Sequence, residues 1–283
     1  MFRSSHLSAP SHHVALVTGA SSGIGKATAA ALVAAGFTTY ATARRVETLA
    51  DLKAAGCETL PLDVTDEDSM VSAVRMVTAT HGGVDVLVNN AGYGEYGPLE
   101  ELALDDVRRE FETNVFGLLR MSQLVLPGMR ERGWGRIINV SSMGGEMALP
   151  AGGAYHASKY AVEALSDVLR AEVAAFGVAV SVIQPGGVRT NFMARATGSS
   201  TIQRDTGPYA QLNARLITAT QSDAFQRLWH SPEDIARVIV RAAQAARPHT
   251  RYKISLEAHL LPALRRILPD RGWDALMHRI LPT

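Results

Sequence analysis

The sequence predicts an α/β fold: one doubly wound domain with a mostly parallel, seven-stranded sheet that helices cover on both faces. Short, almost wholly apolar runs alternate with helical patterns along most of the chain, as strands buried on both faces of a parallel sheet require. A glycine-rich turn joins the first apolar run to the first helical one. Polar clusters follow several of the apolar runs, and right-handed crossovers bring the carboxyl ends of parallel strands to one edge of the sheet, where ligands bind.

The first unit runs from residue 14 to residue 35. An apolar strand over 14–18 precedes Gly19, Gly23 and Gly25, and a helix over 26–35 follows. Glycine permits positive φ and close backbone approach, and a helix N-terminus directs N–H groups and its positive dipole end at an anion. The pyrophosphate of a dinucleotide is the natural anion here. The order G-x-x-x-G-x-G differs from the G-x-G-x-x-G dinucleotide fingerprint, so the turn alone is also compatible with an ordinary loop before a helix.

Apolar runs and helical periodicity place the remaining elements. The further strands are expected over 37–42, 57–62, 84–89, 135–141 and 178–183, with an edge strand over 252–255. The further helices are expected over 46–55, 66–80, 104–132, 154–176 and 231–246. Asp66 and Ser231 are the expected N-caps, and Pro232 suits the first helical position. Pro127 and Gly128 should disturb the end of the long helix.

The domain organisation is expected to be simple. Residues 1–12 should form a flexible arm, and residues 13–257 the main domain. The periodicity weakens over 188–230, which predicts a substrate lid with one or two short helices, one of them over 206–218. Residues 258–283 should form two short amphipathic helices, broken at Pro269 and packed on the same domain.

Composition narrows the function classes. The chain has 283 residues, 47% of them hydrophobic, and a net charge of +1, which does not favour a nucleic-acid partner. A single cysteine, Cys57, allows no intramolecular disulfide, and no secretory signal or spanning segment is visible, so a cytoplasmic location is expected. His156 and His230 lack partners at ligand spacing, so no metal is expected.

The most informative chemical group is Ser142, Tyr155 and Lys159. Tyr155 and Lys159 lie one helical turn apart, hence on one face of the predicted helix. A phenol has a pKa near about 10, and a neighbouring ammonium favours the phenolate, so we expect a lowered pKa for Tyr155. Ser142 follows a strand and can reach the same edge of the sheet. Together the three could move a proton at an alcohol or carbonyl oxygen while a hydride moves at carbon, although Y-x-x-x-K alone is more often a surface pair.

With these motifs, the chain resembles the short-chain dehydrogenase/reductase family, whose fold is a Rossmann domain. The matching residues, between about positions 13 and 190, are 18–25, Asp63, 89–92, Asn114, Ser142, Tyr155, Lys159 and Pro185-Gly186. The resemblance implies that Tyr155 is the general acid/base and that Lys159 holds the nicotinamide ribose and tunes Tyr155. It also implies that Ser142, with Ser141 as its competitor, orients the substrate, and that Asn114 holds a water in a proton relay.

The cofactor expected from the sequence is NADP(H). After the second strand, NAD sites carry an acid for the ribose 2′-hydroxyl, whereas NADP sites offer arginine to the 2′-phosphate. This chain has Arg44 and Arg45 there and no acid before Glu47, although either arginine could instead be a solvated surface charge. The candidate cofactor-binding residues are Gly19, Ser21, Ser22, Gly23, Ile24, Gly25, Arg44, Arg45, Asp63, Val64, Asn90, Ala91, Gly92, Tyr155, Lys159, Pro185, Gly186, Val188 and Thr190.

An apolar pocket favours a bulky hydrophobic substrate over a phosphorylated sugar. The candidate substrate-binding residues are Tyr93, Ser142, Gly144, Met147, Phe192 and Met193. We therefore expect an oxidoreductase that interconverts a hydrophobic secondary alcohol and a ketone, or a primary alcohol and an aldehyde. Residues 186–192 and the tail resemble the branch that contains 17β-hydroxysteroid and retinol dehydrogenases, and a generic carbonyl reductase without steroid preference is the alternative. A homodimer or homotetramer is plausible.

Two other classes stay open. A non-catalytic NADP-binding regulatory protein could share the fold, but it would not need Tyr155 and Lys159. A membrane-surface reductase of lipids or retinoids could use residues 260–281, where arginines stand beside leucines. A tail packed on its own domain or on a partner subunit is the favoured interpretation.

Overall fold

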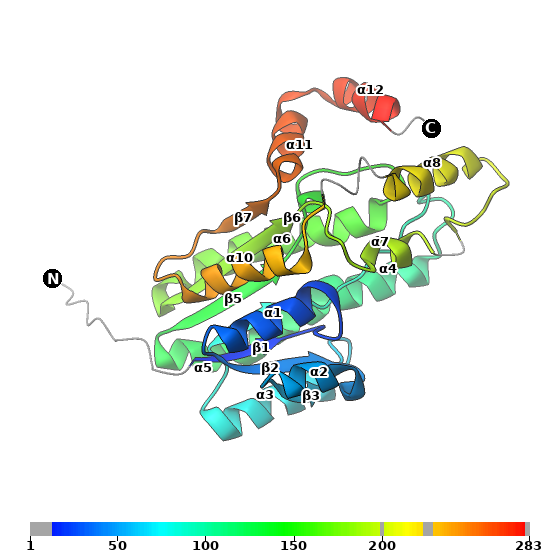
Figure 1. The fold of residues 1–283 in the computed structure, drawn as a ribbon. Helices are drawn as coiled ribbons and strands as arrows, with labels where there is room; N and C mark the ends of the chain where they lie inside the picture. The colour runs from blue at the N-terminus through cyan, green and yellow to red at the C-terminus, as the bar shows by residue number, and fades with distance from the viewer. Residues whose placement is uncertain (1–12, 199–200, 223–228, 281–283) are drawn as a thin grey trace.

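The computed structural model describes residues 13–198, 201–222 and 229–280, so the expected arm over 1–12 lies outside the described residues. The predicted α/β architecture is confirmed, with seven strands in the order β3-β2-β1-β4-β5-β6-β7 (Figure 1). Every neighbouring pair is parallel, including the edge pair β6–β7. The strands are β1 Val14–Val17, β2 Thr38–Ala43, β3 Glu58–Pro61, β4 Val86–Asn89, β5 Gly135–Val140, β6 Val178–Pro185 and β7 Arg251–Ile254. The order reverses between β1 and β4, and such a reversal is where doubly wound sheets bind their ligands.

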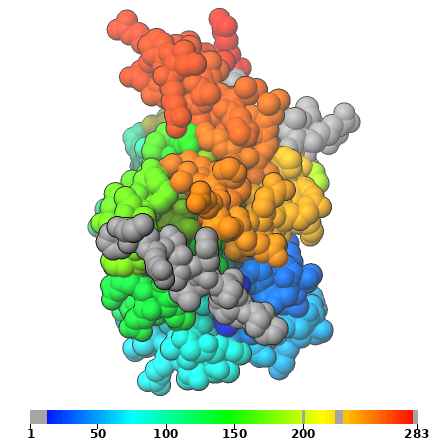
Figure 2. Space-filling view, turned by 90° about the vertical axis from the view of Figure 1, so that its left-hand side faces the viewer, coloured from blue at the N-terminus to red at the C-terminus, as the bar shows by residue number. Residues whose placement is uncertain are grey.

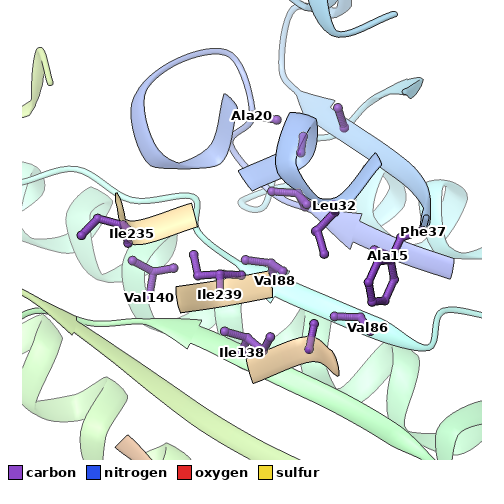
Figure 3. Close-up of a cluster of buried hydrophobic side chains, with 14 of the residues drawn as sticks. Ala15, Ala20, Leu32, Phe37, Val86, Val88, Ile138, Val140, Ile235 and Ile239 are labelled. Carbon is purple, nitrogen blue, oxygen red and sulfur yellow. The ribbon is translucent and has the colours of Figure 1, made fainter. Parts of the chain in front are cut away.

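Helices cover both faces of this sheet. They are α1 Gly23–Ala34, α2 Ala50–Ala54, α3 Glu67–His81, α4 Leu104–Phe111, α5 Leu118–Arg132, α6 Gly153–Val173, α7 Phe192–Ala196, α8 Ala210–Gln221, α10 Pro232–Gln244, α11 Leu256–Ile267 and α12 Asp270–Ile280. Successive residues of a strand point to opposite faces. Ala15 and Val17 of β1 therefore join the core beneath α1 and α10 (Figure 3), whereas Leu16 joins the core beneath α3 and α5.

The first helix begins three residues earlier than predicted. Ser22 is extended, with φ −162°, and α1 starts directly at Gly23. Gly23 and Gly25 thus lie inside the first helical turn, although glycine ordinarily disfavours a helix interior. The close contacts of this turn, described below, explain why glycine is retained.

The long helix predicted over 104–132 is interrupted differently from the prediction. It passes through Pro127 without ending and stops at Gly133, which adopts φ 66°. The irregularity lies earlier, in a π-helical segment, Glu112–Gly117, between α4 and α5. The expectation that Pro127 and Gly128 disturb the helix end is therefore wrong, because a left-handed glycine beyond them ends the helix.

The lid and the tail contain the expected short helices. The described part of 188–230 holds α7 and α8, and α8 starts four residues later than the helix predicted over 206–218. The two tail helices break at Pro269 and project from the rest of the molecule (Figure 2). Trp273 and Met277 of α12 pack with Met147. These contacts support packing of the tail on the same domain, which stays a prediction. Within the described segments, no helix is both long and apolar enough to span a membrane.

The start of α10 has a complete capping box. The Ser231 hydroxyl accepts from the Asp234 N–H at 3.2 Å, and the Asp234 carboxylate accepts from the Ser231 N–H at 2.8 Å. Because α10 packs against α1, a loosened cap should weaken the core of this face.

We expect Ser231→Ala to lower the free energy of unfolding by about 1 kcal/mol, the usual loss when an N-cap hydroxyl is removed. Urea denaturation followed by circular dichroism measures the change. Thr218→Ala is the matched control, because Thr218 is exposed and its hydroxyl donates to the Ala214 carbonyl within α8. Equal effects of the two substitutions would show that the cap makes no specific contribution to the stability of this helix.

Candidate active site

The glycine-rich turn after β1 lies in close contact with the end of β4. A Cβ on Gly19, whose φ is +67°, would lie 2.8 Å from the Cα of Ala91. A Cβ on Gly25 would lie 2.4 Å from both the Gly19 carbonyl oxygen and the Asn90 side-chain nitrogen. The Asn90 amide donates to the carbonyls of Thr18 and Gly19, at 2.9 and 3.1 Å. Only glycine fits these two positions, so the turn and the end of β4 form one rigid edge.

The N-terminus of α1 opens beside this edge. Ser22 makes no side-chain capping bond, and no acidic residue occupies the first turn. Ser21 and Ser22 are exposed, and Ile24 is half-buried. The first N–H groups of the helix are thus available to an anion. Together with the glycine-rich turn they form an anion cradle, which fits a dinucleotide pyrophosphate.

Arg44 and Arg45 follow β2 and are exposed. Arg44 lies near enough to the Tyr93 hydroxyl to oppose the rise that burial causes in the pKa of Tyr93. Asp63 follows β3, and one of its carboxylate oxygens accepts from the backbone and hydroxyl of Thr65, at 3.0 and 2.8 Å. Val64 is buried, and a Cβ on Gly117 would lie 2.4 Å from its carbonyl oxygen.

The end of β6 closes the opposite side of the cradle. A Cβ on Gly23 would lie 3.1 Å from the Thr190 methyl group, so the segment after β6 touches the first turn of α1. Val188 forms an isolated parallel bridge with His230. Pro185 pairs with Ile254 of β7, and a Cβ on Gly186 would clash with the side chains of Ser255 and Glu257.

Tyr155 and Lys159 lie on the face of α6 that is turned towards these strand ends, and both are buried. The Lys159 ammonium lies 5.8 Å from the centroid of the Tyr155 ring and donates to the Val140 carbonyl at 3.0 Å. The Ser142 hydroxyl accepts from the Gly144 N–H at 3.1 Å and forms a hydrogen bond with Tyr155. The Ser141 hydroxyl is buried with no hydrogen-bond partner among the described residues, so Ser142 is the serine beside the phenol.

The pKa values differ from the simple expectation. Burial raises the pKa of Tyr155 to about 12, and the hydrogen bond with Ser142 only partly opposes this rise. Burial lowers the pKa of Lys159 to about 8, although the carboxyl groups of Glu110 and Glu163 raise this pKa and so oppose the fall. The expectation of a lowered Tyr155 pKa is therefore wrong for the protein alone, because loss of hydration outweighs the hydrogen bond with Ser142 and the charge of Glu110 adds to the rise.

Asn114 lies in the π-helical segment, with its side chain fully engaged. Its amide oxygen accepts from the Tyr93 N–H at 3.0 Å. Its amide nitrogen donates to the Tyr93 carbonyl at 2.8 Å, to the Ser158 hydroxyl at 3.0 Å and to Glu110 at 3.2 Å. A Cβ on Gly92 would lie 2.9 Å from the Asn114 amide oxygen and 3.7 Å from the Lys159 ammonium, so Gly92 lies beside both groups.

Sequence reasoning missed Glu110 and Ser158 as neighbours of this site. The available signal was spacing: Glu110 precedes Asn114 by four residues, and Ser158 directly precedes Lys159. A charged residue in a helical pattern is ordinarily read as exposed, which hid the role of Glu110.

Apolar side chains from the loop after β4 and from residues 188–230 lie against the Tyr155 ring. The rings of Tyr96 and Phe192 lie 5.7 and 5.2 Å from it, centroid to centroid. Met193 packs against the same hydrophobic cluster. Gly144 lies beside α6, where its carbonyl oxygen forms a hydrogen bond with His156 Nδ1 at 3.1 Å. Met147 differs, because its fully buried side chain packs with Trp273 and Met277 instead of this cluster.

This chain is similar in sequence and in fold to known proteins. A family model described as short chain dehydrogenase matches residues 13–200. Human 17-beta-hydroxysteroid dehydrogenase type 1 is 39% identical over 282 residues, which cover 94% of this chain and 85% of that protein. The NADPH-dependent 3-dehydrocapnine reductase of Ornithobacterium rhinotracheale is 33% identical over 276 residues, 94% of this chain and 96% of that protein. A crystal structure of a short-chain dehydrogenase from Streptomyces avermitilis superposes with a TM-score of 0.79 at 37% identity, covering 96% of this chain and 99% of that one.

Proposed function

Since this chain belongs to the short-chain dehydrogenase/reductase family, we propose that it is an NADP(H)-dependent oxidoreductase that interconverts a hydrophobic carbonyl compound and its alcohol. One observation carries the proposal. Tyr155, Ser142 and Lys159 gather at the same strand ends as the anion cradle of α1, so a proton donor and a nucleotide site share one edge of the sheet.

Tyr155 is the general acid/base in this proposal. When bound, the nicotinamide ring supplies or accepts the hydride at the substrate carbon. With its raised pKa, the phenol keeps its proton at neutral pH, which is the form that carbonyl reduction requires. The Ser142 hydroxyl, which is hydrogen-bonded to Tyr155, can form a hydrogen bond with the same substrate oxygen and hold that oxygen beside the phenol.

Lys159 stabilises the charge that proton transfer leaves behind. Its ammonium lies close to the Tyr155 ring, in a buried environment where a positive charge acts strongly on a phenolate. Asn114 holds the Tyr93 backbone through two hydrogen bonds and joins it to α6 through a third with Ser158, the residue before Lys159.

The choice of NADP(H) over NAD(H) rests on Arg44 and Arg45. Both are exposed after β2, where a 2′-phosphate would lie, and a planar guanidinium suits bidentate phosphate binding. The relative from Ornithobacterium is described as NADPH-dependent, which supports the same choice here.

A hydrophobic substrate is supported by the cluster around Tyr155. The rings of Tyr96 and Phe192 contribute apolar surface beside the phenol, and Leu212 belongs to the same hydrophobic cluster. The similarity to a protein named for a hydroxysteroid is in keeping with a bulky, apolar alcohol or ketone.

We expect Tyr155→Phe to reduce kcat with a hydrophobic ketone by about 100-fold to 10,000-fold, because the proton donor is lost while the ring remains. The dissociation constant for NADPH, from fluorescence titration, should change less than about threefold. Tyr160→Phe is the matched control on the same helix, since Tyr160 is largely exposed. Full turnover by Tyr155→Phe would exclude Tyr155 as the acid, and binding without turnover in the wild type would favour the regulatory alternative.

We expect Arg44→Ala combined with Arg45→Ala to weaken NADPH binding by about 10-fold to 100-fold, the loss of one or two charge-assisted hydrogen bonds. NADH binding should stay within about threefold, because NADH lacks the 2′-phosphate. Isothermal titration with both cofactors measures the difference, with exposed Arg75→Ala on α3 as the control. Equal losses for the two cofactors would contradict the phosphate assignment.

A second candidate function, contact with a membrane surface, is favoured by one face of α11. Leu256, Leu260, Leu264 and Ile267 follow helical spacing and are all exposed. Exposed arginines of α12, Arg271 and Arg279, could meet anionic headgroups.

If this face binds membranes, the wild type should float with anionic vesicles, and Leu260→Gln with Leu264→Gln should reduce the bound fraction at least about tenfold. Met76→Gln, an exposed apolar residue on α3, is the control and should float like the wild type. A wild type that stays at the bottom of the gradient would rule out this function.

A further inference from the structure

Glu110, near the end of α4, is a buried carboxyl group with few partners. Its exposed fraction is 0%. One carboxyl oxygen accepts from the Asn114 amide at 3.2 Å. The other is buried without a side-chain partner among the described residues, and the Glu95 backbone is the further hydrogen-bonding group beside this carboxyl. A buried charge without a cation partner is costly, so such a group ordinarily keeps its proton.

A second buried carboxyl group shows the contrast. Glu163 on α6 accepts from Gln184 at 2.9 Å and pairs with Arg251 at 3.0 Å. Its charge is thus compensated within the protein, whereas no ion pair joins Glu110 to a basic residue in the described structure. Glu110 is therefore a different kind of group from an ordinary structural carboxylate.

The groups that face Glu110 belong mostly to the active site. From α6, the Lys159 ammonium favours the carboxylate, and Glu110 in turn favours the charged lysine and disfavours the Tyr155 phenolate. From the loop after β4, the Glu95 backbone favours the carboxylate, and the Glu95 side chain opposes it.

Two tyrosines complete the surroundings. The charge of Glu110 adds to the rise that burial causes in the pKa of Tyr93 and of Tyr96. The neighbouring Arg109 pairs with Asp106 on the exposed side of the helix. Burial outweighs the favourable contacts and raises the pKa of Glu110 to about 8.

We propose that Glu110 is a positioning residue of this active site. Its carboxyl group fixes the Asn114 amide, and when it loses its proton in alkaline solution its negative charge keeps Lys159 an ammonium ion. The part that concerns turnover rests on the proposed function, whereas the protonation of Glu110 does not.

Two substitutions separate the two roles. Glu110→Gln keeps an oxygen that can accept from Asn114 but removes the ionisation. Glu110→Leu removes both and leaves the Asn114 amide with one partner fewer. At neutral pH, where Glu110 is protonated, Glu110→Gln should keep kcat/KM within about threefold of the wild type, whereas Glu110→Leu should lower it about tenfold or more.

The alkaline limb of the pH profile tests the charge. Without the Glu110 carboxylate, Lys159 should lose its proton more readily, so the alkaline fall of kcat/KM should move to lower pH in Glu110→Gln. An unchanged limb would overturn this role. Glu163→Gln, on α6, is the control for loss of a buried carboxylate outside α4, and this substitution should lower stability by a similar amount at every pH from 6 to about 9.

Two measurements need no turnover. The folded pKa of about 8 lies above the ordinary 4.5, so the unfolded chain releases this proton first and the wild type loses stability as pH rises between these values. The melting temperature of Glu110→Gln minus that of the wild type should therefore increase from pH 5 to about 8 and then level. A difference that stays flat would overturn the proposal.

Infrared spectroscopy of the wild type at neutral pH should show the C=O stretch of a protonated carboxyl group that Glu110→Gln lacks and Glu163→Gln keeps. Identical spectra would also overturn the proposal. If these two measurements succeed but no tested ketone is reduced, the proposed function fails while the assignment of Glu110 as a buried acid stands.

Discussion

The contact on which the rest of this molecule depends is the approach of two backbones at the switch point of the sheet. Gly19 and Gly25 have no Cβ, so the turn after β1 lies directly on Asn90 and Ala91 at the end of β4. The Asn90 amide ties the two strand ends together through carbonyls of the turn. Because this edge is rigid, the first N–H groups of α1 and the groups on α6 share a fixed frame.

Within that frame, burial sets the chemistry more than pairing does. The same loss of hydration keeps the proton on Tyr155 and on Glu110 and favours the neutral form of Lys159. Tyr155 and Glu110 thus keep their protons at neutral pH, whereas Lys159 stays mostly an ammonium ion that gives up its proton more readily than a lysine in water. The pKa values of such a site respond strongly to a new charge placed beside it, because little solvent is present to screen that charge.

Sequence patterns predicted most of the framework, because a parallel sheet leaves a strong signature in apolar strands, and glycines and the Tyr155–Lys159 spacing are local features. What they missed depends on three-dimensional burial. The pKa of Tyr155 moves opposite to the expectation from one neighbouring charge, Met147 packs under α12, and Glu110 turns inward from a charged stretch of helix. Pro127 was also misjudged, because the end of α5 is set by Gly133 instead.

The π-helical segment has a consequence for how this chain can vary. A turn with i→i+5 bonds accommodates one surplus residue, which offsets the faces of the two flanking helices by about 100°. After the segment, Met121 and Val125 of α5 pack in the core under the sheet, whereas Glu110 before the segment is hydrogen-bonded to Asn114. One continuous stretch of chain thereby carries two independent surfaces. Substitutions on α4 can therefore change the surroundings of the proposed active site while the core packing of α5 stays the same.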